Sequence, residues 1–260
     1  MITITNLKVG GFDPRWASFR GFSLLFDNPE NSLTHLQKGI KQLSVDPNQP
    51  KLSLYKKLSE ALDQIGRDFL INTYLFCPLP LQSYHVTVWD GGNNANLYFV
   101  QQKHRRSFED FMQRLPESIA NATPFTTMIT QSSLVNQTWN LEFEFDQLEI
   151  WGNEALVAKL LPYNSSNDLE RLKKERDSLT NDFYKQFGIK PVDKYTPHVS
   201  LGYFANKELA QLATCYLKKW NEVIYKSVYG QTIAFNSISL YGFMDMATFF
   251  RNDRLNSGGH

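Results

Sequence analysis

The stretch Tyr84-His85-Val86-Thr87-Val88-Trp89 has a counterpart in the second half of the chain, Tyr195-Thr196-Pro197-His198-Val199-Ser200-Leu201. Each stretch contains the tripeptide His-x-Thr/Ser within a run of β-branched and aromatic residues, a composition typical of strands. Because side chains alternate between the two faces of a strand, each histidine shares a face with the hydroxyl residue two positions later. We therefore expect two strands, near residues 83–89 and 196–203, that each present an imidazole and a hydroxyl in a row.

A hydroxyl residue also lies two positions before each histidine, Ser83 in the first stretch and Thr196 in the second. Two such rows facing each other would hold a small anion between two groups that can transfer protons. A single His-x-Thr on a strand is more often structural. Two copies at matching places in the chain favour one shared site for a small anion.

The composition of the chain indicates which kinds of ligand it is suited to bind. The chain has 260 residues, 42% of them hydrophobic, which is enough for one large domain or two small lobes. Lys and Arg number 27 against 26 Asp and Glu, without the basic excess that accompanies strong nonspecific binding to nucleic acids. We expect a nucleotide, a short RNA or another small ligand rather than a long duplex.

Cys77 and Cys215 form no Cys-x-x-Cys pair, so we expect reduced, buried thiols and a cytoplasmic protein. The start of the sequence has neither a basic segment nor a long apolar run, and no stretch is long and apolar enough to span a membrane. Metal-binding spacings such as His-Glu-x-x-His do not occur, so we predict neither a metal site nor a cofactor.

Hydrophobic periodicity and end signals predict the remaining elements. Helices are expected from a cap at Asn31 or Ser32 to about 43, and over 52–70, 97–119 with an end or kink at Pro116, 168–187 and 206–227. Strands are expected over 21–26, 73–76, 141–145, 148–151, 155–161 and 232–242, and Asp90–Asn94 has the composition of a turn.

The expected elements form a loose repeat. The order of motif strand, helix and β segment occurs over 83–161 and again over 196–250, with the helix 168–187 between the copies. In this comparison 125–134 matches 232–240. A duplicated unit would place the two histidines near a pseudo-twofold axis, where both could reach one cleft.

The paired motifs resemble those of the two-histidine (2H) phosphoesterase superfamily, which includes LigT-like RNA 2′,3′-cyclic phosphodiesterases. The first motif continues with Val88 where the common form has leucine, and the second keeps Leu201. The resemblance implies an α+β fold with two pseudo-symmetric lobes of antiparallel sheet, flanked by helices around a central groove. We expect one catalytic domain of two lobes over residues 1–255 and a flexible tail over 256–260.

The resemblance also implies a reaction, the metal-independent hydrolysis of a phosphodiester in a 2′,3′-cyclic nucleotide, an RNA end or a short oligonucleotide. His85 and His198 would act as general acid and base, in an order that the sequence leaves open. The Thr87 and Ser200 hydroxyls would donate hydrogen bonds to the nonbridging phosphate oxygens. A noncatalytic module that binds a nucleotide or RNA end on the same fold is the alternative, and a metal-dependent hydrolase is a third reading.

Aromatic residues near the motifs are candidates for stacking on a base. Tyr84 and Tyr195 precede the two histidines, and Tyr203 ends the second strand. Trp89, four residues after His85, would lie on the same face of the strand and is expected at the edge of the groove. Lys194 and the basic run 103–106 could attract phosphate, although the run falls on a predicted helix, where basic side chains are commonly solvated.

Overall fold

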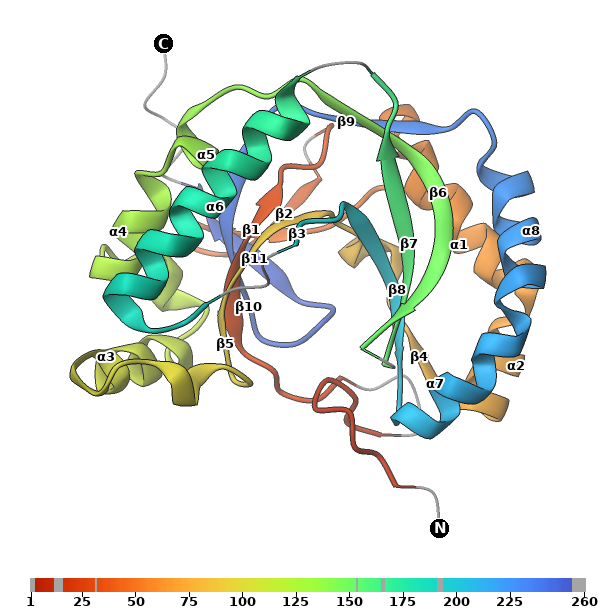
Figure 1. The fold of residues 1–260 in the computed structure, drawn as a ribbon, viewed down its shortest axis with the longest axis horizontal. Helices are drawn as coiled ribbons and strands as arrows, with labels where there is room; N and C mark the ends of the chain where they lie inside the picture. The colour runs from red at the N-terminus through yellow and green to blue at the C-terminus, as the bar shows by residue number, and fades with distance from the viewer. Residues whose placement is uncertain are drawn as a thin grey trace.

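A computed structural model describes residues 3–11, 16–30, 32–152, 154–164, 167–190 and 194–253. It contains two antiparallel sheets whose outer faces are covered by helices (Figure 1). The predicted α+β fold, with antiparallel sheets flanked by helices, is therefore confirmed. The predicted tail over 256–260 lies outside the described residues.

The first sheet has six strands in the order β2-β3-β11-β10-β1-β5. Their bounds are β1 Gly21–Phe26, β2 Leu33–Gln37, β3 Ile40–Leu43, β5 Thr87–Asn93, β10 Ile238–Phe243 and β11 Phe249–Asn252. Every pair is antiparallel. Segments from both ends of the chain meet here, because β1 lies between β5 and the late strand β10. The first motif therefore enters the sheet at its edge.

The second sheet has five strands in the order β4-β8-β7-β6-β9, and its pairs are also antiparallel. Their bounds are β4 Phe76–Pro78, β6 Leu141–Trp151, β7 Ala155–Pro162, β8 His198–Phe204 and β9 Thr232–Phe235. The predicted strands 141–145 and 148–151 are one continuous strand, β6, which pairs with β7. The second motif begins β8, inside this sheet.

The helices fall into two groups (Figure 1). Those against the first sheet are α3 Gln102–Gln113, α4 Pro124–Thr130, α5 Ser133–Asn136 and α6 Asp168–Phe187, and those against the second are α1 Ser53–Ile65, α2 Arg67–Tyr74, α7 Lys207–Ala213 and α8 Leu217–Val228. Single turns of 3-10 helix are η1 Pro50–Leu52, η2 Leu81–Ser83, η3 Leu97–Phe99, η4 Glu117–Ala120 and η5 Thr214–Tyr216. The predicted helix over 168–187 is confirmed, and the expected helices 52–70 and 206–227 are each divided in two.

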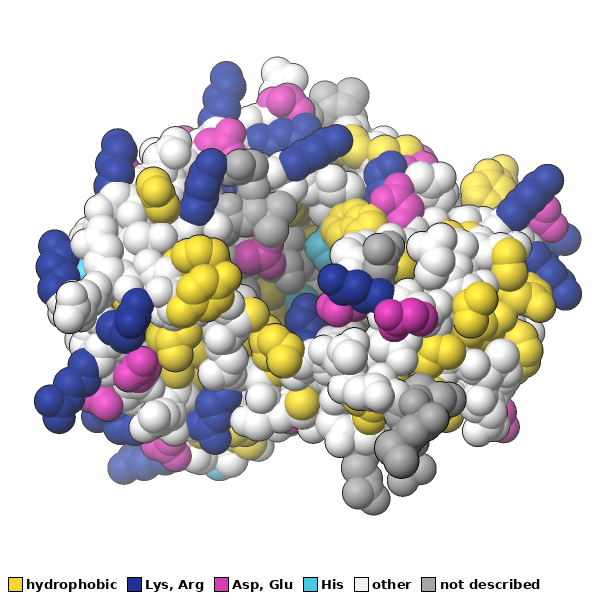
Figure 2. All heavy atoms as spheres, turned by 60° about the horizontal axis from the view of Figure 1, so that its bottom comes forward, with side chains coloured by type: hydrophobic (Ala, Val, Ile, Leu, Met, Phe, Trp, Pro, Cys, Tyr) yellow, Lys and Arg dark blue, Asp and Glu magenta, His cyan; other side chains and the backbone are white. Residues whose placement is uncertain are grey.

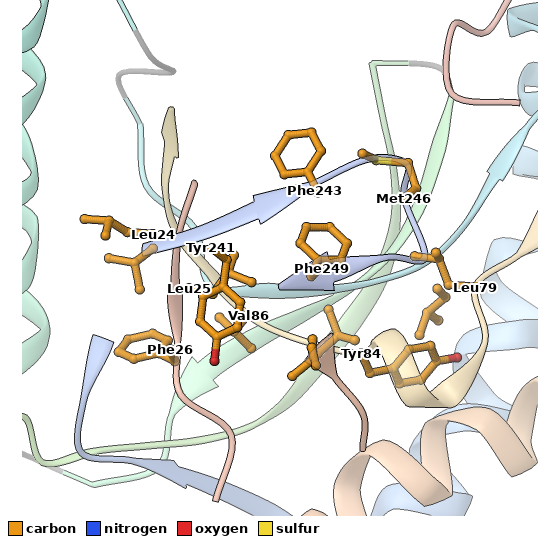
Figure 3. Close-up of a cluster of buried hydrophobic side chains, with 14 of the residues drawn as sticks. Leu24, Leu25, Phe26, Leu79, Tyr84, Val86, Tyr241, Phe243, Met246 and Phe249 are labelled. Carbon is orange, nitrogen blue, oxygen red and sulfur yellow. The ribbon is translucent and has the colours of Figure 1, made fainter. Parts of the chain in front are cut away.

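The buried core is continuous through both sheets. Figure 3 shows part of it, with Leu25 of β1, Val86, Tyr241 of β10 and Phe249 of β11 in one cluster. The side chains of these four residues belong to segments far apart in the sequence. The strand that enters with the first motif is therefore fixed by packing against the first sheet.

The helix expected to end near residue 43 is wrong, because this region forms the β2–β3 hairpin. Leu33, Leu36, Ile40 and Leu43 recur at spacings that also suit a helix. The pairing of β3 with β11, more than 200 residues later, decides the outcome, since tertiary pairing overrides a weak local pattern. Ser32 donates its hydroxyl to the Pro29 carbonyl instead of capping a helix, and Asn31 lies outside the described residues.

The turn expected at Asp90–Asn94 is also wrong, because β5 continues to Asn93. The two glycines serve close packing instead of a turn. A Cβ on Gly91 would lie 2.2 Å from the Phe22 carbonyl oxygen, and one on Gly92 would lie 2.1 Å from the Phe108 ring. Gly-Gly here lets a neighbouring strand and a helix approach the β5 backbone.

The internal repeat holds only in part. The second motif begins β8 as expected, whereas the strand expected near 83–89 starts only at Thr87, because Ser83 belongs to η2 and Val86 pairs through an isolated bridge. The match fails for the segments after the motifs. Residues 125–134 lie in α4 and α5, whereas their expected match, 232–240, lies in β9 and β10. Thr123 starts α4 with a reciprocal capping box to Thr126, which the sequence comparison did not weigh. The two halves therefore share their motif strands and differ in how the surrounding layers are completed.

Neither cysteine forms a disulfide in the described part of the chain. Cys77 is buried as predicted, whereas the prediction of burial is wrong for Cys215, which is exposed in η5 on the outer helical layer. None of the helices in the described part of the chain combines the length and apolar character that crossing a bilayer requires.

Candidate active site

The middle residues of the two motifs, Val86 and Val199, pair through an antiparallel β-bridge, and both are fully buried. In antiparallel register the residues on either side also face one another, so His85 lies opposite Ser200 and Thr87 lies opposite His198. The four polar side chains share the face that the valines do not use, and all four are partly exposed. Directly opposite residues in such a pair have Cβ atoms about 4.5–5.5 Å apart. The bridge thus joins the two sheets and gathers both motifs in one place.

The two imidazoles are held in the same way. Nδ1 of His85 lies 2.7 Å from the Ser83 carbonyl oxygen, and Nδ1 of His198 lies 3.0 Å from the Thr196 carbonyl oxygen. A carbonyl only accepts, so Nδ1–H donates in both rings and Nε2 is left for proton transfer. Ser83 and Thr196, expected from the sequence to extend a polar row, contribute their backbone carbonyls here.

An aromatic ring packs on each imidazole. The Phe249 ring lies 4.2 Å from the His85 ring between centroids, and the Trp151 ring lies 4.3 Å from the His198 ring. The interplanar angles, 52° and 55°, are nearly equal. Each imidazole is therefore fixed between a carbonyl and an aromatic face. The sequence analysis identified neither aromatic residue, because both are distant from the motifs in the chain.

Burial sets the protonation of both rings. Desolvation lowers the pKa of His85 to about 4, against an opposing effect of the Ser83 carbonyl, and the nearby charge of His198 lowers it further. Desolvation also lowers the pKa of His198, while the Thr196 carbonyl and Asp90 raise it and Lys8 lowers it. The effect of the His198 charge on the pKa of His85 indicates that the two rings lie close enough to interact electrostatically.

A cavity of about 350 Å³ opens beside His198 and Thr87. Its other lining residues are Val88, Asp90, Trp151, Arg176, Lys194, Tyr195 and Thr196. Figure 2 shows histidine side chains inside a hollow on one face of the molecule. A larger cavity of about 560 Å³ lies between α4, α5 and α6, but none of the motif residues lines it. The smaller cavity is the one next to a motif histidine, His198, whereas His85 and Ser200 are not among its lining residues.

A β-bulge follows each histidine by three positions. Leu25 pairs with Thr87 and Leu24 with Trp89, so Val88 is the extra residue in β5. Val157 pairs with Ser200 and Leu156 with Gly202, so Leu201 is extra in β8. A bulge reverses the alternation of side chains beyond it. Beyond Thr87 and Ser200, the alternation of side chains therefore no longer predicts which face of the sheet a residue occupies.

The bulge corrects the expected position of Trp89. Its indole is fully buried, donates from Nε1 to the Thr180 hydroxyl at 3.1 Å, and packs edge-on against Phe183. It is thus in the core and not at the groove edge. Asp90, the next residue, lines the cavity instead.

The three tyrosines lie in different surroundings. Tyr195 lines the cavity. Tyr84 is buried against Tyr55, and Tyr203 is mostly buried, with the Lys8 ammonium 4.5 Å above its ring. The structure thus brings Tyr195 to the cavity and leaves Tyr84 in the core.

Of the basic candidates, Lys194 lines the cavity. The run 103–106 lies in α3, on the outer layer, where Arg105 donates to the Tyr98 carbonyl oxygen at 2.8 Å.

Arg176 of α6 is the cationic lining residue that the sequence analysis missed. It is buried, its Nε donates to the Val88 carbonyl oxygen at 3.0 Å, and its guanidinium lies 5.5 Å from the centre of the Tyr195 ring. The signal was present, because Arg176 occupies the same helix face as the buried Leu172 and Leu179. An arginine on the apolar face of a charged helix indicates a buried function for its guanidinium.

Among the residues that the structure describes, no three or more His, Cys, Asp or Glu side chains are grouped so that they could hold a metal ion.

Comparison with known proteins supports the fold. No family model matches the sequence, and no curated protein matches it. A conserved protein of unknown function from Agrobacterium tumefaciens has a similar structure, with a TM-score of 0.54, 12% identity, and coverage of 93% of this chain and 88% of that one. Two structures of Kluyveromyces marxianus Usb1, one with uridine monophosphate, match at TM-scores of 0.38 and 0.40, with 11% and 14% identity and coverage of 90% of this chain and 98% of theirs. At 12% identity the first of these likenesses shows a similar fold and nothing more.

Proposed function

We propose that this protein is a metal-independent phosphodiesterase that hydrolyses a cyclic phosphate, at a 2′,3′-cyclic nucleotide or RNA end, or a phosphodiester in a short oligonucleotide. The observation that carries the proposal is the Val86–Val199 bridge, which gathers two identically held imidazoles and two hydroxyls on one face. Hydrolysis of a phosphodiester requires one group that takes a proton from water and another that gives a proton to the leaving oxygen. Two imidazoles with free Nε2 atoms meet that requirement.

The hydroxyls of Thr87 and Ser200 supply a second element. Each lies opposite a histidine in the bridge register, so both reach a phosphorus centre placed between the imidazoles. There they donate hydrogen bonds to the nonbridging oxygens, which gain charge in the transition state. Arg176 and Lys194 on the cavity wall provide positive charge for an anionic substrate.

A bound phosphate also changes the histidines. In the free protein, burial lowers the pKa of both rings, so neither imidazolium is favoured at neutral pH. A phosphodiester anion between the rings favours the charged form of one of them. Substrate binding thereby produces the one-neutral, one-protonated pair that acid–base hydrolysis uses.

The test measures hydrolysis of nucleoside 2′,3′-cyclic phosphates and of a short RNA with a cyclic-phosphate end, with EDTA present throughout. We expect His85→Ala and His198→Ala each to lose roughly 10²–10⁴-fold in rate. His35→Ala, which removes an exposed imidazole from β2, is the matched control and should leave the rate unchanged. Tight binding of these ligands without turnover by the unaltered protein, or full activity in both motif variants, would overturn the proposal.

A further inference from the structure

The two motifs differ in the fifth residue after each histidine. In the first motif this residue is Asp90, which the bulge at Val88 turns into the cavity that His198 also lines. In the second motif it is Tyr203, whose ring lies under the Lys8 ammonium at 4.5 Å. The site therefore repeats its imidazoles, carbonyls and aromatic rings, but at this motif position it carries a carboxylate in one half and a tyrosine in the other.

Asp90 acts on His198 among several charged groups. Four of the charged groups around His198 come from four different segments. They are Asp90 of β5, Arg176 of α6, Lys8 of the N-terminal segment and Lys194 of the loop before β8. On the strands beside β8, Lys159 pairs with Asp146 at 2.9 Å and with Glu149 at 3.4 Å, so its charge is compensated locally. His85 completes the set. Of these, Asp90 has the largest charge effect on the pKa of His198, and it favours the imidazolium.

The cavity lies on the same side. It is lined by His198 and Thr87, with Trp151 and Tyr195 on its walls. Its volume of about 350 Å³ falls at the lower end of small-molecule sites. A nucleoside attached to the phosphorus centre therefore has its room beside His198.

We propose that Asp90 is a positioning residue that gives the general-acid role to His198 and the general-base role to His85, and that the leaving nucleoside occupies the cavity that Asp90 and His198 line. This inference rests on the proposed phosphodiesterase function and adds the direction of the reaction. Neither the motifs nor their pseudo-symmetry fixes that direction.

The step balances as follows. Nε2 of His85 takes a proton from water while the water oxygen bonds to phosphorus. The bond from phosphorus to the ribose oxygen breaks, and that oxygen takes the proton from Nε2 of His198. The products are a phosphate monoester and a ribose hydroxyl. His85 then returns a proton to solvent and His198 regains one, so no other reactant is consumed.

The first experiment compares leaving groups. One substrate is a nucleoside 3′-(4-nitrophenyl phosphate), whose leaving 4-nitrophenolate needs no proton, and the other is a dinucleotide, whose ribose leaving group does. We expect His198→Ala to lose roughly 10²–10⁴-fold on the dinucleotide and less than about tenfold on the nitrophenyl ester. His85→Ala should lose activity on both. The reverse pattern, or equal losses on both substrates for both variants, would overturn the assignment.

The second experiment tests Asp90 with the near-isosteric Asp90→Asn. We expect kcat for the dinucleotide to fall about tenfold above neutral pH, because the alkaline limb of the pH profile moves down by about one unit. KM should stay within about twofold, and hydrolysis of the nitrophenyl ester should be unchanged. A purely structural role for Asp90 would not move the pH limb.

Asp182→Asn is the matched control. It removes the same charge from an exposed position on α6, and it should leave both profiles unchanged. An unmoved alkaline limb in Asp90→Asn, or a shift of equal size in Asp182→Asn, would overturn the role of Asp90. If the unaltered protein cleaves neither substrate, or if both histidine variants stay active, the phosphodiesterase function itself fails. A reversed leaving-group pattern in an active protein refutes only the present inference.

Discussion

His85 and His198 make the same local contacts, but strands from different sheets supply the aromatic ring that packs on each imidazole. Each ring donates from Nδ1 to the carbonyl two residues earlier, and each lies under an aromatic ring at nearly the same distance. The ring on His85, Phe249, begins β11 of the first sheet, whereas the ring on His198, Trp151, ends β6 of the second sheet at the hairpin with β7. Both rings thus stand at strand ends, and the two strands differ in the contacts that hold them.

The anchor of β11 is a buried polar network. The Asp27 carboxylate accepts hydrogen bonds from Ser237, Ser239 and Tyr241 at 2.8–2.9 Å, and it pairs with Arg251 of β11. Only 14% of each charged side chain in the ion pair is exposed. These contacts tie β11 to β10 and to the end of β1, and so they fix the ring that covers His85. The comparison teaches that the same contacts to an imidazole can be supplied by strands that are held by different interactions.

The largest effect is expected from Asp27→Asn. The variant leaves the Arg251 guanidinium without its carboxylate in a mostly buried place, and breaking such a pair costs about 3–5 kcal/mol. Urea denaturation measures the change in the free energy of unfolding. Asp253→Asn breaks the Lys41–Asp253 pair near the same strand, whose side chains are 40% and 45% exposed, and should cost less than about 1 kcal/mol. Equal losses in the two variants would refute the special role of Asp27.

Variants of the two motif hydroxyls test whether both halves of the site contact the phosphate. We expect Thr87→Ala and Ser200→Ala each to lower kcat roughly 10²–10³-fold, because each removes one donor to a nonbridging oxygen. Thr87→Ser and Ser200→Thr keep the hydroxyl and are the matched controls, with losses below about tenfold. A large loss at one position alone would mean that only one half contacts the phosphate.

Strand parity was enough to predict which four side chains gather at the site. His85, Thr87, His198 and Ser200 all lie before the bulges, so the two-residue repeat holds for them. Trp89 lies beyond the bulge at Val88, and for it the same reasoning fails. No residue in the stretch marks the bulge, since Val88 and Leu201 are ordinary strand residues. The prediction fails where pairing with neighbouring strands, and not the two-residue alternation, decides the direction of each side chain.

The rest of the site depends on tertiary placement. Trp151 and Phe249 reach the imidazoles from strands that the sequence places far away. Arg176 was accessible to prediction in principle, as a charge on the buried face of α6, but its contact with the Val88 carbonyl follows only from how α6 packs. Likewise, the pairing of β3 with β11 turned an apparent helical spacing into a hairpin. Local sequence thus predicted β1, β7, α6 and the strand of the second motif, whereas long-range pairing decided the β2–β3 hairpin and the start of β5.

The lowered pKa of His85 predicts how the free energy of unfolding changes with pH. The pKa of His85 is lowered from 6.5 to about 4, so the unfolded chain takes up the proton first as pH falls. The contribution of neutral His85 is present in full above pH 6.5 and declines between pH 6.5 and about 4, by a total on the order of 3 kcal/mol. Compared with the unaltered protein, His85→Gln should show a weaker loss of unfolding free energy over that window. Urea titrations between pH 7 and 4.5 measure it, and a difference that is constant with pH would contradict the prediction.

The smallest expected effect separates the two aromatic rings. Removing a ring lets water reach the imidazole beneath it, so Phe249→Ala should raise the pKa of His85 by about one unit, and Trp151→Ala should raise the pKa of His198 by a smaller amount. NMR titration of the ring protons follows each histidine separately. Trp16→Ala, which removes a ring from Tyr203 and not from an imidazole, should leave both values unchanged.

The sizes of the two pKa rises test the proposed role of Asp90. Desolvation lowers the pKa of both rings, but at His198 the carboxylate already opposes it. Water that replaces Trp151 both relieves the desolvation and screens Asp90, and these changes act in opposite directions on the pKa of His198. The rise should therefore be smaller at His198 than at His85. In the Asp90→Asn background the screening contribution disappears, and the two rises should become equal. A larger rise at His198 than at His85 with Asp90 present would mean that the carboxylate is not the charge that distinguishes the two halves.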